Sequence, residues 1–161
     1  MRRILPLSLS LLPALLLSGD GYHVEKWLTH AELTATSRCI FTATVVKTAH
    51  IHAVREAYGR RTRYVSRYRL LVRIDRVLKG DPLPDEGRQK PCWLEQGGRF
   101  IPGKWLLLAE AYRNGIDPGQ AKKGDRILVY AHSRNGQTCQ LRGLDPVTMA
   151  AATEALLKRN Q

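Results

Sequence analysis

The sequence has few cysteines and few acidic residues. Cys39, Cys92 and Cys139 are the three cysteines, and they form no CxxC pair. No cysteine lies near Gly19, so a lipoprotein-type lipid anchor would lack its acceptor thiol. Asp and Glu number 14 against 26 Lys and Arg, which gives a formal net charge of +12. This charge favours phosphate or sulfate polymers and anionic lipid surfaces as partners, although it also serves solubility.

The N-terminal segment has the pattern of a secretory signal. Residues 1–19 combine Arg2 and Arg3 with a Leu-rich run followed by small residues. Prolines interrupt the run, which is short for a stable membrane span, so a membrane anchor is the less favoured alternative. We therefore expect a signal peptide over 1–19 and a single domain over 20–161. The mature protein is expected to be secreted or periplasmic, with no stable transmembrane anchor after cleavage.

The stretch Tyr64–Pro84 predicts one long, half-buried strand. Its apolar residues alternate with arginines, so one face is suited to a core and the other to water or a polyanion. It closes at Lys79-Gly80-Asp81-Pro82, where Gly permits a positive φ and Pro cannot continue a central ladder. Turns are expected at Gly97-Gly98 and Asn135-Gly136. Further strands are predicted over 39–52, 92–95, 104–112, 126–132 and 138–142.

A helix is predicted at each end of the domain. Apolar residues recur at helical spacing between Val24 and Ala35, which indicates a short amphipathic helix before the first strand. Near the C-terminus, Asp145 is expected to cap a second helix that has Pro146 in its first turn. Leu144 is expected to staple onto Met149 across that cap.

These elements indicate a mainly β fold. About five strands, most with one apolar face, lie between the two helices. We predict a small five-stranded antiparallel OB-like barrel with a short N-terminal helix and a C-terminal helix. The alternative is an open β-sandwich.

The order of these features resembles the netrin-like, or tissue-inhibitor-of-metalloproteinase-like, OB-fold domains of secreted proteins. The resembling pieces are the helix leading into CIFTATVVKT, the strands YRLLVRIDRVLKG and KKGDRILVYAH, and TCQLRGLDP before the terminal helix. The resemblance implies a five-stranded barrel flanked by helices that serves as a secreted binding scaffold. The metalloproteinase inhibitors of that family chelate the protease zinc through an N-terminal cysteine. Inhibition by that mechanism is not expected, because this chain has no cysteine before Cys39.

The main candidate site is a basic belt that also contains tyrosine. Guanidinium groups bind phosphate or sulfate through two hydrogen bonds, and exposed tyrosines stack on bases or sugars. Alternatively, the arginines form an ordinary solvated face that protects the strand against edge pairing. The members of this arginine belt are Arg55, Tyr58, Arg60, Arg61, Arg63, Arg67, Arg69 and Arg73.

Histidines and cysteines offer two further candidate sites. His50 and His52 lie on one side of an extended strand, but a metal site needs three or four ligands, so neither a metal nor a cofactor is predicted. In an oxidising compartment, three cysteines favour one disulfide and one buried or free thiol. Cys39 opens an apolar strand and is typical of a core residue. Cys92 and Cys139 lie beside turn-rich segments and are therefore the candidate pair.

No motif identifies a reaction. Cys39 and Ser133, which is next to His132, could act as nucleophiles, yet neither lies in a recognisable nucleophile motif. We therefore predict a non-enzymatic secreted or periplasmic binding module whose partner is an unspecified protein or envelope component. One alternative is a polyanion-binding protein that takes lipopolysaccharide, a sulfated glycan or nucleic acid. A hydrolase is the other.

Overall fold

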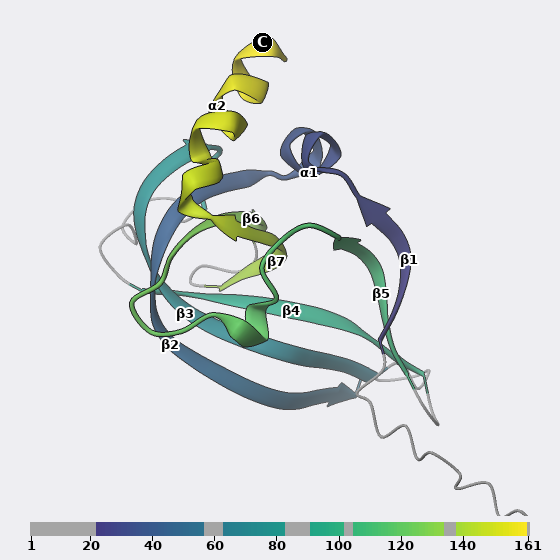
Figure 1. Cartoon of the computed structure of the whole chain (residues 1–161). Helices are drawn as coiled ribbons and strands as arrows, with labels where there is room; N and C mark the ends of the chain where they lie inside the picture. Colours follow the sequence, from purple (N-terminus) through teal and green to yellow (C-terminus); the bar gives the residue numbers. More distant parts are fainter. Residues whose placement is uncertain (1–21, 57–62, 83–90, 102–104, 134–137, 161) are drawn as a thin grey trace, which may run out of the picture.

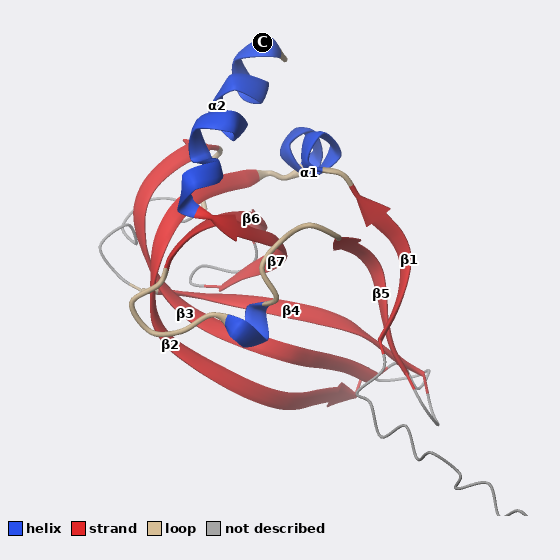
Figure 2. Cartoon of the chain, in the orientation of Figure 1, coloured by secondary structure: helices blue, strands red, loops and turns tan. Residues whose placement is uncertain are grey.

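A computed structural model of the protein describes residues 22–56, 63–82, 91–101, 105–133 and 138–160, with only the backbone described at several strand ends. Within these ranges the chain is mainly β, with a helix at its C-terminal end (Figures 1 and 2). The strands are β1 (Tyr22–Leu28), β2 (Cys39–Glu56), β3 (Arg63–Lys79), β4 (Cys92–Ile101), β5 (Trp105–Tyr112), β6 (Arg126–Ser133) and β7 (Thr138–Pro146). The helices are α1 (His30–Thr36) and α2 (Ala150–Arg159), with short 3-10 helices η1 (Pro118–Gln120) and η2 (Val147–Met149).

Five of the strands close a barrel. β3 lies between β2 and β4, β6 lies between β2 and β7, and these four pairings are antiparallel. β4 also pairs with β7 in parallel, which closes the circle and makes the barrel mixed. The predicted purely antiparallel arrangement is therefore wrong, and so is the open sandwich. Parallel neighbours need a connection longer than a hairpin, and β5, η1 and β6 supply it.

The other two strands form an arm beside the barrel. β1 pairs in parallel with β5, and β5 pairs with the end of β4 through Arg99, Phe100 and Ile101. Figure 1 shows β1 and β5 running together along one side of the molecule. The predicted helix between Val24 and Ala35 is wrong over its first half, because residues 24–28 lie in β1 and pair with β5.

Helix α1 is short and is fixed at both ends by side chains. Thr29 and Glu32 form a capping box at its start, since each side chain bonds the other residue's backbone N–H. At its end, Lys79 Nζ donates to the carbonyl oxygens of Thr34 and Ala35 at 3.0 and 2.9 Å. The last residue of β3 therefore supplies a cation where the helix dipole is negative.

Strand β3 ends where the sequence predicts. Its last residue is Lys79, and Gly80 follows with a φ of 65°. Strand β4 is longer than expected, because Gly97 and Gly98 pair with Ser66 and Val65 of β3. The predicted turn at these glycines is wrong, since the long β3 edge gives their backbone groups partners.

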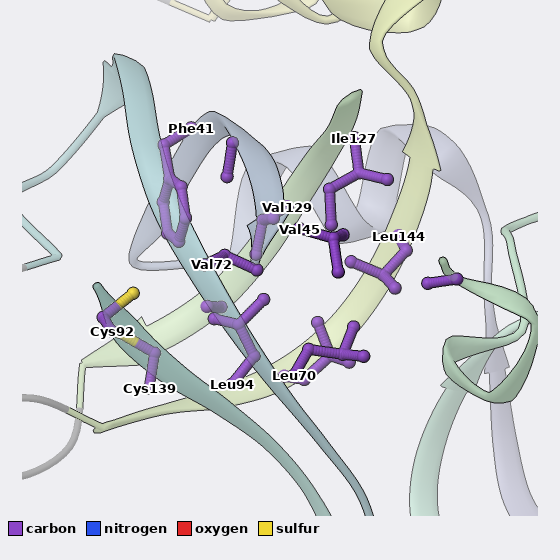
Figure 3. Close-up of a cluster of buried hydrophobic side chains, with 14 of the residues drawn as sticks. Phe41, Val45, Leu70, Val72, Cys92, Leu94, Ile127, Val129, Cys139 and Leu144 are labelled. Atoms are coloured by element: carbon purple, nitrogen blue, oxygen red, sulfur yellow. The ribbon is translucent and has the colours of Figure 1, made fainter. Parts of the chain in front are cut away.

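The core has an inner and an outer part. Figure 3 shows the inner cluster, where side chains such as Phe41, Leu70 and Val129 pack inside the barrel. Ile40 and Leu128 are also fully buried, but they belong to a second cluster with Leu28, Leu33 and Tyr130. Both faces of β6 are therefore buried, which explains its continuous apolar run.

The C-terminal helix forms, but its start differs from the prediction. β7 extends through Pro146, and α2 begins only at Ala150 after η2. Asp145 is 2% exposed and accepts a hydrogen bond from Tyr130, so it does not cap the helix. Leu144 packs in the inner cluster and Met149 against the outer one, so the predicted staple is also wrong.

None of the helices in the described ranges is long and apolar enough to cross a membrane. The predicted signal peptide over 1–19 lies outside the described residues.

Candidate functional site

A cavity of about 210 Å³ lies between the barrel and the β1–β5 arm. Its walls come from β1 and β5 on the arm, from β3, β4 and β7 on the barrel, and from the segment that leads into η1. The cavity therefore depends on the whole tertiary arrangement. Apolar residues such as Ala111 and Ile116 and polar ones such as Gln96 and Arg113 both line it.

Three aromatic rings line this pocket. Trp27 comes from β1, Tyr68 from β3 and Tyr112 from the end of β5. Trp27 is 40% exposed and is the one large hydrophobic residue exposed in the described part of the chain. An exposed tryptophan beside a cavity is a common feature of binding sites, because its large flat surface gains most when a ligand covers it.

Two arginines at the pocket have different environments. The Arg142 side chain is only 8% exposed and forms an ion pair with Glu110. Its Nη1 also donates to Thr36 Oγ1 at 2.7 Å. Arg113 is exposed, and its guanidinium lies 5.3 Å from the ring centre of Trp27. Arg142 therefore joins β5, β7 and α1, whereas Arg113 has no carboxylate partner among the described residues.

Close packing around the loop after β5 sets the shape of the pocket. The Ile116 N–H donates to the Leu144 carbonyl at 2.7 Å, which ties the loop to β7. Asp117 caps η1 by accepting from the Gly119 N–H at 2.9 Å. A Cβ at Gly119 would lie 2.8 Å from the end of the Tyr68 side chain, so a larger residue here would displace that ring from the pocket wall.

A buried polar network lies behind the pocket. Tyr130 Oη donates to Asp145 Oδ2 at 3.1 Å, and His30 Nε2 lies 2.9 Å from both Tyr130 Oη and Thr153 Oγ1. These groups come from α1, β6, β7 and α2, so the network joins both helices to the barrel. Burial raises the pKa of Asp145 and of Tyr130. Burial and the nearby Asp145 carboxylate raise the pKa of Tyr112 to about 12, so this pocket residue is a neutral phenol at neutral pH.

The arginine belt is described only in part. Arg55, Arg63 and Arg67 lie on β2 and β3, but their side chains are outside the described part. Tyr58, Arg60 and Arg61 lie wholly outside it.

The two belt arginines with described side chains both lie near acids. Arg69 Nε is 2.9 Å from Glu95 Oε1, and its guanidinium lies 4.4 Å from the ring centre of Trp93. Arg73 Nε is 3.9 Å from Asp75 Oδ1. Arg69 is thus held by neighbours on β4, while Arg73 remains exposed.

The histidine candidates are not brought together with further ligands. His50 and His52 lie on β2, and their side chains are outside the described part. The described residues contain no group of three His, Cys, Asp or Glu side chains that could hold a metal ion. His132 is near Arg38 instead, because its Nδ1 accepts from the Arg38 backbone N–H at 3.4 Å.

The three cysteines are buried, and none of them takes part in a disulfide. Cys39 belongs to the inner core, as predicted, and so do Cys92 and Cys139. Figure 3 shows Cys92 and Cys139 next to each other at the edge of this cluster. Hydrogen bonding with Cys139 and burial raise the pKa of the Cys92 thiol. The predicted Cys92–Cys139 disulfide is wrong, because the two thiols are held together by packing and hydrogen bonding and not by a covalent bond.

The sequence reasoning missed the pocket residues. The helical spacing predicts a helix at Trp27, and no local pattern connects Trp27 with Tyr112 and Arg113, which lie far from it in the sequence. One available signal was Thr29-x-x-Glu32, a capping-box pattern that starts the helix at His30 and leaves residues 22–28 free to form a strand.

Comparison of the chain with models of known protein families and with curated proteins gives no match.

Proposed function

We propose that this protein is a non-enzymatic binding module of the secreted or periplasmic space, and that it holds its partner at the pocket between the barrel and the β1–β5 arm. The observation that carries this proposal is the 40% exposed Trp27 at the wall of a cavity of about 210 Å³. Binding sites are typically concave, with aromatic walls and a few polar groups that fix orientation. Trp27, Tyr68 and Tyr112 supply such walls, and Gln96 and Arg113 supply polar groups.

The barrel supports an OB-like, netrin-like assignment within this proposal. The barrel order is β2–β3–β4–β7–β6. Its one parallel pairing joins β4 and β7, which are the third and the fifth barrel strands along the sequence. OB barrels are small five-stranded Greek-key barrels that bind ligands with strand faces and loops. The partner must still be argued from the site, because one fold serves many functions.

The proposal is tested by capture from an envelope or secreted fraction with the full chain and with Trp27→Ala. We expect specific capture of a partner by the parent protein and at least a tenfold loss with Trp27→Ala. Trp93→Ala is the matched control, since Trp93 lies on β4 outside the pocket lining. Equal capture by the parent and Trp27→Ala would contradict a role for the pocket.

Polyanion binding by the arginine belt is a second candidate, favoured by the net charge of +12. In this case binding to heparin or lipopolysaccharide weakens steeply between low and moderate salt, because each contacted anion releases counterions. Replacing Arg60, Arg61 and Arg67 with Ala should flatten the dependence of affinity on salt. Absence of binding to both polymers at low salt would contradict this candidate.

A further inference from the structure

We propose that the pocket takes a single ring that carries a carboxylate, with the ring against Trp27 and the carboxylate on Arg113. This inference rests on the proposed function of the pocket and names the chemistry of its ligand. The carboxylate-bearing ring can come from a uronic acid unit of a glycan or from an aromatic acid.

Arg113 gives the pocket an exposed cation that suits an anionic group, while Asp117 keeps its negative charge near η1. Arg142 forms an ion pair with Glu110 and donates a hydrogen bond to the end of α1. Asp117 accepts a hydrogen bond in the first turn of η1. Arg113 is exposed at the pocket, and its contact in the described part of the chain is the Trp27 ring. A guanidinium binds a carboxylate through two parallel hydrogen bonds, which fix the orientation of the bound group.

The neutral part of the pocket selects a ring. Trp27 and Ala111 lie opposite each other in the β1–β5 register, and both line the pocket with Tyr68. Flat ligands stack favourably on such aromatic surfaces. The volume of about 210 Å³ has room for one ring. Gln96, opposite Tyr68 in the β3–β4 register, adds an amide that can both donate and accept hydrogen bonds.

The test is a titration of the full chain with D-glucuronate, benzoate and D-glucose, followed by the indole N–H signals in two-dimensional NMR. Trp27→Phe identifies the Trp27 signal. We expect saturable shifts of this signal with glucuronate, with benzoate or with both, and at least tenfold weaker binding of glucose. Glucuronate alone would identify a sugar ring, and benzoate alone an aromatic one.

Variants of Arg113 separate the effect of its guanidinium group on affinity from the effect of positive charge alone. Arg113→Ala should weaken binding of the carboxylate-bearing ring by roughly tenfold or more, and Arg113→Lys should have an intermediate effect, because Lys keeps the charge without the planar pair of donors. Arg126→Ala is the matched control, since this exposed arginine on β6 lies outside the pocket lining.

Two results would overturn the inference. One is equal affinity for glucose and glucuronate, which would remove the role of the charge. The other is no shift of the Trp27 signal with either acid. If Trp27-dependent capture from the envelope or secreted fraction persists in that case, the pocket still binds a partner and only the ligand class is wrong.

Discussion

Tyr130 donates a hydrogen bond to Asp145 at 3.1 Å, and both side chains are buried where helices α1 and α2 meet the barrel. His30 and Thr153 complete the set of polar groups around the Tyr130 hydroxyl. A buried network of this kind is stabilising only when its members keep their partners. The contact therefore couples the helices to β6 and β7.

Removing the Tyr130 hydroxyl should destabilise the fold. Tyr130→Phe keeps the ring in the outer cluster but leaves Asp145 and Thr153 without this partner. We expect the free energy of unfolding to fall by roughly 1–3 kcal/mol, which is the cost of a buried polar group that loses its hydrogen bond. Urea denaturation at neutral pH measures the change. A loss below about 0.3 kcal/mol would show that the network does not hold the helices in place.

Asp145 should make stability fall as the pH rises. Burial raises the pKa of Asp145 in the folded state above its ordinary value of 3.8. Between the ordinary pKa of 3.8 and the higher folded-state pKa, the folded state binds more protons than the unfolded state. The stability that Asp145 contributes is therefore complete below about pH 3.8 and is lost as the pH rises through the folded-state pKa. Urea denaturation of the parent and Asp145→Asn between pH 3 and 7 tests this. The advantage of the parent over the variant should shrink with rising pH, and a constant difference would contradict the assignment.

His132 should make stability fall as the pH falls, and over a higher pH range than Asp145. Burial, with the positive charges of Arg142 and Arg38, lowers the pKa of His132 below 6.5. As the pH falls, His132 takes up its proton in the unfolded state before it does so in the folded state. Stability is therefore lost as the pH falls below about 6.5. His132→Gln should remove this part of the pH dependence while leaving the Asp145 part. The measurement is thermal unfolding between pH 5 and 7.5, where an unchanged slope in the variant would count against the prediction.

The barrel strands were predictable because their signals are local. Alternation predicts β2 and β3, with the end of β3 at Gly80, and apolar runs predict β6 of the barrel and β5 of the arm. The parallel pairing of β4 with β7 was not predictable, because it joins segments that are far apart in the sequence and leaves no alternation of its own. β1 was missed for a similar reason, since its partner β5 lies roughly eighty residues further along the chain.

The candidate site was harder to predict than the fold. The arginine belt is a local cluster in the sequence and is therefore easy to recognise. In the structure, however, Arg69 is held by Glu95 and Trp93. The pocket combines Trp27 with Tyr68 and Arg113, which no local pattern connects. Asp145 had the sequence position of a helix cap, but a buried tyrosine hydroxyl competes for its carboxylate.

Gly80 allows a final prediction about the end of β3. Its φ is 65°, and a Cβ there would collide with the Arg38 carbonyl oxygen. Gly124 has a φ of 93°, but a Cβ there would meet nothing within 4 Å. Both Gly→Ala variants therefore carry the cost of a left-handed backbone, roughly 1–2 kcal/mol, and only Gly80→Ala adds a collision with backbone.

Thermal or urea unfolding of the two variants separates these costs. We expect Gly80→Ala to be more destabilising than Gly124→Ala by roughly 1–3 kcal/mol, since the Arg38 carbonyl lies directly before β2 and can move only by shifting that strand. Equal losses would mean that backbone conformation alone makes glycine necessary at position 80. A larger loss for Gly124→Ala would contradict the close approach of Gly80 to Arg38.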